Sequence, residues 1–207
     1  MEDRNGSMDM ARAPRGRALW SELLQLPNLL SLARILLTPV FVLMMLQRRP
    51  WAAFGVFLAA GATDALDGFT ARQLHLKSNL GLWLDPIADK LLLTAAFVVL
   101  TLPALAEPNA LPVWLTAVCV GRDVVISLGA LVIVALRGKR RFPPTLAGKA
   151  STICQVFLIY FVLYLNAAGG SPRSLAWIYV LTVLLAAGSF VHYVFIAVRM
   201  LRQPRAS

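Results

Sequence analysis

The sequence predicts an all-α integral membrane protein with six transmembrane helices and a short N-terminal amphipathic helix in the membrane interface. Of its 207 residues, 58% are hydrophobic and only 14% are charged, whereas soluble domains carry close to a quarter charged residues. The apolar residues gather in stretches of about 20, the length a helix needs to cross the hydrocarbon core of a bilayer. These two observations exclude an ordinary soluble domain.

Six apolar stretches are separated by prolines and short polar segments. They cover residues 29–46, 51–71, 82–102, 111–136, 149–167 and 175–200. Proline inside a helix removes a hydrogen bond and kinks or breaks the helix, and Pro50, Pro103 and Pro172 stand in the gaps. Residues 18–26 place apolar side chains at helical spacing beside polar ones, which is typical of a helix lying in the membrane interface. We expect a disordered basic arm over 1–16 and a single membrane domain over 17–203.

The positive charges indicate how the helices are oriented. The formal charge is +10, but the basic residues stand at the ends of apolar stretches and form no aromatic-interleaved surface for nucleic acid. Fourteen Lys and Arg lie in the two terminal segments and in the second and fourth connections, against three in the others. The positive-inside rule therefore places both termini and the 72–80 loop in the cytoplasm, most simply at a bacterial inner membrane. The pair Arg48 and Arg49 opposes this assignment.

Four carboxylates stand at fixed spacing where apolar stretches end and begin. Asp64 and Asp67 are three residues apart near the end of the second stretch, and Asp85 and Asp89 are four apart at the start of the third. Each pair therefore shares one face of its helix. Because a short loop joins the two helices, we expect the four side chains to converge just inside the membrane boundary.

A carboxylate in a membrane needs a compensating charge. Insertion scales give about 2.5–3.5 kcal/mol for each ionised Asp at the bilayer centre, and Arg72, Lys77 and Lys90 are too few to satisfy four of them. Hard divalent cations bind carboxylate oxygen, and a pair of them can clamp a phosphoryl group. The pattern thus predicts two Mg²⁺ or Mn²⁺ ions. Taken singly, each Asp also has a structural interpretation; Asp85 before Pro86, for example, fits a helix N-cap.

Small residues accompany the carboxylates. Gly68 and Ala71 follow Asp67 on the same helix, and Gly81 precedes Asp85 by four residues. Small side chains at these positions let a bulky ligand such as a nucleotide approach the backbone and the metals. The same spacing is also common where membrane helices pack together.

The segment from Asp64 to Asp89 resembles the signature of a known family. It fits DxxDGxxARx8GxxxDxxxD of the CDP-alcohol phosphatidyltransferases at all eight fixed positions over 26 residues. The opening PNLLSLARILLTP, with Pro27, Asn28, Arg34 and Pro39, is similar to that of the glycerophosphate and cardiolipin branches of this family. Six membrane helices in about 200 residues also agree with it.

The resemblance implies a reaction and roles for the signature residues. The donor would be CDP-diacylglycerol, the acceptor an alcohol, and the products a glycerophospholipid and CMP; a homodimer is also implied. The metal ligands would be Asp64, Asp67, Asp85 and Asp89, with Asp89 also the catalytic general base. The CDP-binding residues would be Asp64, Asp67, Gly68, Ala71, Arg72 and Gly81.

A second charged site lies in the fourth apolar stretch. An arginine inside a membrane span is as costly as an aspartate, and Arg122 and Asp123 both occur there. One interpretation is an ion pair that holds helices together. The other is a cationic cup for a phosphate-bearing acceptor or for anionic headgroups of membrane lipids. The acceptor-binding residues would then be Arg122, Lys149, Lys139 and Arg140.

The acceptor is the open part of the functional hypothesis. Glycerol 3-phosphate leads, which would make the chain a phosphatidylglycerophosphate synthase. A cardiolipin synthase that uses phosphatidylglycerol is the alternative, because the string GRD around Arg122 resembles that branch at least as well. A divalent-cation transporter or a non-catalytic membrane binding protein is a third possibility, but an ion path should distribute acidic residues across the bilayer instead of gathering them at one side.

Overall fold

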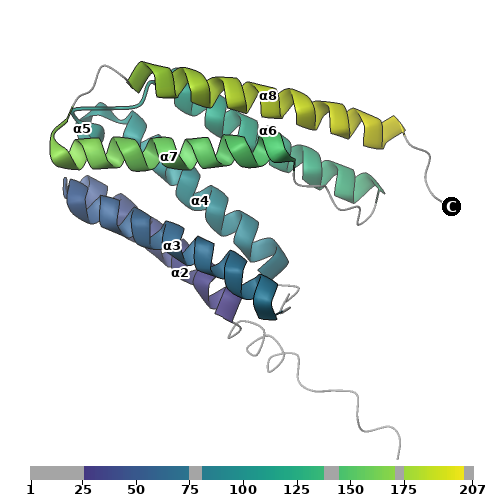
Figure 1. Ribbon diagram of the computed structural model, residues 1–207, viewed down its shortest axis with the longest axis horizontal. Helices are drawn as coiled ribbons and strands as arrows, with labels where there is room; N and C mark the ends of the chain where they lie inside the picture. Colours follow the sequence, from purple (N-terminus) through teal and green to yellow (C-terminus); the bar gives the residue numbers. More distant parts are fainter. Residues whose placement is uncertain (1–25, 75–80, 138–144, 171–174, 203–207) are drawn as a thin grey trace, which may run out of the picture. The chain divides into compact units, whose positions relative to one another are not determined.

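The computed structural model describes residues 26–74, 81–137, 145–170 and 175–202, and the described residues are helices and the turns between them (Figure 1). The helices are α2 (Leu26–Leu46), α3 (Pro50–Leu74), α4 (Gly81–Thr101), α5 (Pro103–Ala106), α6 (Val113–Arg137), α7 (Leu146–Ala168) and α8 (Leu175–Arg202). Side chains are described for residues 29–63, 87–133, 145–170 and 175–199. No strand occurs within these ranges, so the all-α prediction is confirmed for this part of the chain.

Each long helix lies on one of the six apolar stretches of the sequence. Four helices contain stretches long and apolar enough to cross a membrane, and α3 contributes a shorter apolar stretch, Pro50–Thr63. The four long stretches are Leu29–Leu46, Val113–Ile133, Leu146–Ala168 and Leu175–Arg199. The chain is therefore a multi-pass membrane protein. The predicted basic arm and interfacial helix lie outside the described residues, apart from Leu26, where α2 begins.

The chain divides into two compact units. The first contains residues 1–39 and 59–92, and the second contains residues 40–58 and 93–207. Within its described part, the first unit holds the beginning of α2, the second half of α3 and the first half of α4. The second unit holds the α2–α3 turn and everything from the middle of α4 onward.

In the second unit, α8 packs against both α6 and α7 (Figure 1). Helix α7 turns one face into the interior, and the apolar side chains of this face are among the least exposed in the protein. They are Leu158, Ile159, Val162 and Leu163. Burial of each such side chain contributes about 1.5–3 kcal/mol where it leaves water. The burial of these four side chains determines which side of α7 faces the neighbouring helices.

The start of α7 is fixed by a capping residue and a close helix approach. Thr145 has an extended backbone and its side-chain oxygen accepts a hydrogen bond of 3.0 Å from the Gly148 N–H, which satisfies a donor that the first turn leaves without an intrahelical partner. A Cβ at Gly148 would lie 2.9 Å from Thr145 Oγ1 and from the ring carbon Cε2 and the hydroxyl oxygen of Tyr193 on α8. Glycine is therefore the residue that permits this approach.

The other end of α7 is tied to the loop between α5 and α6. Both the backbone N–H and the side-chain amide of Asn109 donate to Asn166 Oδ1, each at 3.0 Å. Asn166 in turn donates to the Ala106 carbonyl at 2.9 Å, and Asn109 also donates to the Gly170 carbonyl at 2.6 Å. We call this pair the asparagine clasp. Its hydrogen bonds satisfy backbone polar groups of the α5–α6 loop, which forms no regular secondary structure.

Aromatic rings join the α2–α3 turn region to α7. They are Phe41, Trp51, Phe54, Phe57, Tyr160 and Tyr164. The shortest separation is 4.9 Å between the centroids of Phe57 and Tyr160, at an interplanar angle of 70°, which is the edge-to-face geometry that aromatic pairs prefer. The Tyr160 hydroxyl also donates to the Phe57 carbonyl at 3.2 Å.

Candidate active site

The four signature carboxylates lie on two consecutive helices, as predicted. Asp64 and Asp67 are in the second half of α3, and Asp85 and Asp89 are in the first turns of α4. Only residues 75–80 separate these helices. The side chains of residues 64–86 lie outside the described part, so the convergence of the carboxylates stays a prediction. The same holds for the predicted CDP-binding residues Gly68, Ala71, Arg72 and Gly81.

Asp89 is the one signature carboxylate with a described side chain, and it is ion-paired. Nη1 of Arg34, on α2, donates to Asp89 Oδ1. The Arg34 side chain is 2% exposed, whereas that of Asp89 is 50% exposed. The guanidinium is thus buried in the protein, and the carboxylate it holds remains open to a ligand. A bidentate-capable guanidinium fixes the direction of a carboxylate more firmly than an ammonium does.

Arg34 was missed as a compensating charge by sequence reasoning, which counted only cations near the signature. Its signal was present: an arginine in the middle of an apolar span needs a partner inside the membrane. The family resemblance marked the position, but nothing in the sequence identified Asp89 as the residue it meets. The structure supplies that pairing across 55 positions of sequence.

The donor set suits divalent cations. Four carboxylates on the adjoining ends of two helices offer hard oxygen ligands, which Mg²⁺ and Mn²⁺ prefer. No histidine or cysteine occurs between residues 64 and 89 except His75, so a site built for softer metals is disfavoured. The ion pair with Arg34 involves one oxygen of Asp89, and Asp64, Asp67, Asp85 and Asp89 all stay candidate ligands.

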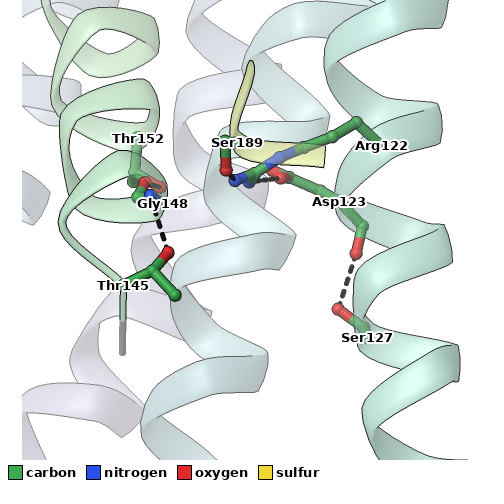
Figure 2. A network of polar contacts seen from close by, with 7 residues as sticks. All are labelled: Arg122, Asp123, Ser127, Thr145, Gly148, Thr152 and Ser189. Carbon is green, nitrogen blue, oxygen red and sulfur yellow. Dashed lines mark hydrogen bonds and ion pairs between the residues drawn. The ribbon is translucent and has the colours of Figure 1, made fainter. Parts of the chain in front are cut away.

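The second predicted site is built around Arg122 on α6. Its Nη1 lies 2.5 Å from Asp123 Oδ1, and its Nη2 donates to the Ser189 hydroxyl on α8 (Figure 2). Its guanidinium carbon also lies 5.8 Å from the centroid of the Tyr193 ring, within the range of a cation–π contact. Arg122 therefore bridges α6 and α8, and its Nε has no hydrogen-bond partner among the described residues.

Whether the other predicted acceptor residues lie beside Arg122 stays a prediction. Lys149 lies on α7 and its side chain is exposed. The α7 residue that approaches the Arg122 cluster is Gly148, through its contact with Tyr193. Lys139 and Arg140 lie outside the described residues.

Two buried polar residues on α7 escaped the sequence analysis. Ser151 and Gln155 are fully buried, and the Ser151 hydroxyl and both polar atoms of the Gln155 amide have no hydrogen-bond partner among the described residues. Buried polar groups in folded proteins are nearly always paired. The signal was their spacing of four residues, which places two polar groups on one face of an apolar helix.

Comparisons with known proteins identify the family. The family model for CDP-alcohol phosphatidyltransferase matches residues 24–200. The chain is 33% identical over 156 residues to the CDP-diacylglycerol--glycerol-3-phosphate 3-phosphatidyltransferase of Bacillus subtilis (strain 168), covering 68% of this chain and 77% of that one.

Proteins of a second name are about as similar. The chain is 32% identical over 216 residues to the human cardiolipin synthase (CMP-forming), covering 91% of this chain and 70% of the human one. A glycerol-3-phosphate enzyme of Pseudomonas fluorescens is 42% identical over 110 residues, covering 50% of this chain and 53% of that relative. The family match spans nearly all the described helices, and the chain belongs to the CDP-alcohol phosphatidyltransferase family.

Proposed function

We propose that this protein transfers the phosphatidyl group of CDP-diacylglycerol to glycerol 3-phosphate and releases CMP. The observation that carries the proposal is the family match over residues 24–200, joined to a signature whose carboxylates lie on the consecutive helices α3 and α4. The glycerol-3-phosphate acceptor is supported by the Bacillus subtilis relative, which bears that activity in its name. The product would be an anionic glycerophospholipid.

Asp64, Asp67 and Asp85 would hold two divalent cations, with Asp89 at their edge. Members of this family generally depend on a divalent metal. Bound there, Mg²⁺ or Mn²⁺ supplies charge neutralisation for the donor pyrophosphate and for the departing CMP. Gly68, Ala71 and Gly81 are proposed to leave room for the cytidine, with Arg72 against the donor phosphates.

Asp89 is proposed to accept the proton of the acceptor hydroxyl. As this proton leaves, the hydroxyl oxygen forms a bond to the phosphorus that carries diacylglycerol. The bond from that phosphorus to the bridging oxygen breaks, and its electron pair leaves with CMP. Arg34 acts on this step as a positioning residue: it holds Asp89 Oδ1 and thereby fixes where the half-exposed carboxylate faces the acceptor. Positioned proton transfer of this kind contributes typically 10²–10⁴-fold to a rate.

The acceptor site is proposed at Arg122, with Lys149, Lys139 and Arg140 as further cations. A phosphate suits a guanidinium that is held in place by neighbours, and Arg122 is held by Asp123 and Ser189. Cardiolipin synthesis from phosphatidylglycerol is the second candidate, favoured by the human cardiolipin synthase, whose match covers 91% of this chain.

The membrane arrangement that we propose has six spans, with α3 and α4 crossing in addition to the four helices already described. The interfacial helix over residues 18–26 would precede the first span. The active site and both termini would face the cytoplasm of a bacterial inner membrane, as the distribution of Lys and Arg indicates. The working form would be a homodimer.

The metal-dependent reaction is tested first with Asp67→Ala. We expect CMP release from CDP-diacylglycerol to fall below about one-thousandth of the wild-type rate, since removal of a principal metal ligand disables the site. The protein should still be recovered from the membrane fraction. A matched control is Leu184→Ala, which changes an exposed apolar residue of α8 and should keep full activity. Metal-dependent activity retained by Asp67→Ala would contradict the two-metal proposal.

The acceptor is tested with a panel on the purified wild-type enzyme. Glycerol 3-phosphate, phosphatidylglycerol, inositol phosphate and serine are each supplied with CDP-diacylglycerol, and the lipid product is identified by mass. We expect phosphatidylglycerophosphate as the main product. A cardiolipin product from phosphatidylglycerol alone would establish the second candidate in its place. In the active enzyme, Arg122→Ala should raise the Michaelis constant of the acceptor far more than that of the donor.

A further inference from the structure

The turn between α2 and α3 carries an arginine where a glycine is expected. Arg49 N–H donates to the Met44 carbonyl and Arg48 N–H to the Met45 carbonyl, each at 3.0 Å. This pair of bonds is the Schellman motif, whose penultimate residue takes a left-handed backbone and is usually glycine. Arg48 occupies that position with φ 53°.

Helix α7 ends in a similar left-handed turn, but there the left-handed residue is Gly169, with φ 70°, and its N–H donates to the Leu165 carbonyl. The Gly170 N–H donates to the Leu165 carbonyl at 2.9 Å, as Arg49 does to Met44. A left-handed backbone costs a non-glycine residue about 1–2 kcal/mol. The backbone is therefore strained at Arg48 and unstrained at Gly169, the corresponding position of α7. A role for the Arg48 side chain would explain why glycine is not used in this turn.

Arg48 and Arg49 line a cavity of about 250 Å³ whose walls all come from the second unit. Met45, Leu105 and Leu163 supply apolar walls, and Glu107 supplies a single carboxylate. The two arginines are exposed, and neither guanidinium forms an ion pair with another described residue. The cavity therefore combines an apolar interior with two positive charges and one negative charge.

The ends of the apolar stretches indicate that the cavity lies at the depth of lipid headgroups. The apolar stretch of α2 ends at Leu46 and that of α3 begins at Pro50, so the turn between them emerges at the edge of the hydrocarbon. Trp51 is exposed directly beside it, and tryptophan is enriched at this interface. Of the lysines and arginines in connecting segments, only Arg48, Arg49 and Arg173 fall on the side opposite the cytoplasmic majority. These charges therefore oppose the orientation of the helices and need another explanation.

We propose that this cavity binds the headgroup of an anionic phospholipid in the leaflet at this end of the helices. Arg48 and Arg49 face its phosphodiester, and the apolar walls face the start of its acyl chains. The net charge of the two arginines and Glu107 is +1, which matches the single negative charge of a lipid such as phosphatidylglycerol. A zwitterionic lipid would leave the positive charge uncompensated. This site is separate from the signature, since Asp64 lies about four helical turns further along α3.

The test is lipid binding to the purified full-length protein in detergent, measured by native mass spectrometry with short-chain phosphatidylglycerol and phosphatidylcholine. The variants are Arg48→Gly, Arg49→Gln and the two combined. Arg48→Gly removes the charge and suits the left-handed turn, so the fold should be kept, which the melting temperature checks. We expect the double variant to bind phosphatidylglycerol about tenfold more weakly and to lose one bound lipid. Its affinity for phosphatidylcholine should not change.

Two further variants separate this site from general attraction to a basic protein. Arg199→Gln removes an exposed arginine near the end of α8 that does not line the cavity and should bind phosphatidylglycerol as the wild type does. Glu107→Gln raises the net charge of the cavity and should tighten binding.

Any of the following outcomes would overturn the proposal. The first is equal affinity in the wild type and the double variant. The second is the same loss in Arg199→Gln as in the double variant. The third is equal binding of phosphatidylglycerol and phosphatidylcholine. Glycerophosphoglycerol, the headgroup without acyl chains, is the competitor that distinguishes a lipid from a soluble anion. If it displaces the lipid at concentrations similar to those at which the lipid binds, the site is one for soluble phosphodiesters and the lipid proposal is wrong.

Discussion

Arg34 and Asp89 form an ion pair in a membrane protein, and the two side chains differ in how far they are exposed. The arginine side chain is buried, whereas the carboxylate is half exposed. Removal of one member of a buried ion pair is typically more damaging than removal of both, because a charge is left without compensation. A comparison of the two single variants with the double variant therefore tests whether Arg34 and Asp89 act together.

We expect Arg34→Ala to lower kcat by on the order of 100-fold while the Michaelis constant of CDP-diacylglycerol changes little, because Asp89 loses its orientation and the donor site keeps its parts. Arg34→Lys should restore part of the rate, since it returns the charge without the planar fork. In an Asp89→Asn background, Arg34→Ala should cost little more, as residues that act as a unit are not additive. An undiminished kcat in Arg34→Ala would show that Arg34 is not a positioning residue.

Gly148 provides a second residue-scale prediction. In Gly148→Ala the new methyl group would lie 2.9 Å from Thr145 Oγ1 and from the Tyr193 ring, so the start of α7 must shift from α8. We expect a loss of about 1–2 kcal/mol in stability, measured by thermal unfolding in detergent. Gly129→Ala on α6 is the matched control, because nothing lies within 4 Å of its added Cβ; alanine should leave stability unchanged or raise it slightly. Similar melting temperatures for the two variants would argue against the close approach.

At the scale of elements, the asparagine clasp holds an irregular loop to the end of α7. In Asn166→Ala, the Asn109 N–H and the Ala106 carbonyl lose their partner, and we expect stability to fall by about 2 kcal/mol. The Asn109→Ala and Asn166→Ala changes should be less than additive, because they share bonds. Thr152→Ala serves as the control, because the Thr152 hydroxyl donates to the Gly148 carbonyl of the same helix and does not join α7 to another element. A clasp variant as stable as this control would contradict the assignment.

The sequence predicted the helices well because their ends are marked by local chemistry. Pro50 opens α3, and the long helices lie on the six predicted apolar stretches with small shifts at their ends. The short helix α5, which begins at Pro103, was not predicted. The α2–α3 turn is different. A left-handed residue is normally inferred from glycine, and Arg48 gives no such signal.

The candidate site was predictable as a set of residues, and less so as a set of contacts. The carboxylates are recognisable because charges are rare in membrane helices. That Asp89 meets Arg34, or that Arg122 meets Ser189 on α8, depends on how distant helices pack, and spacing along one helix carries no information about this. Ser151 and Gln155 could not be singled out from the sequence, because uncharged polar residues are common in helices. Only the structure shows that both are fully buried.

At the scale of the whole molecule, the number of crossings is open to a direct test. In a background without Cys119 and Cys154, both free thiols in the structure, single cysteines replace Gln47, Lys77 and Glu107. With six spans, a membrane-impermeant maleimide should label positions 47 and 107 from one side of sealed vesicles and position 77 from the other, the cytoplasmic side. Labelling of all three from one side would mean that α3 and α4 enter the bilayer without crossing it.

Because α8 is long, the thickness of the bilayer should influence how this helix is tilted. Its apolar stretch, Leu175–Arg199, has 25 residues, or about 37 Å of helix, against about 30 Å for a typical hydrocarbon core. Such a helix accommodates the excess by tilting, and a thinner bilayer requires more tilt. Because Ser189 on α8 accepts a hydrogen bond from Arg122 on α6, a change in that tilt displaces the hydroxyl relative to the guanidinium. We therefore expect lipid chain length to change the geometry of the Arg122 cluster, which is proposed to hold the acceptor.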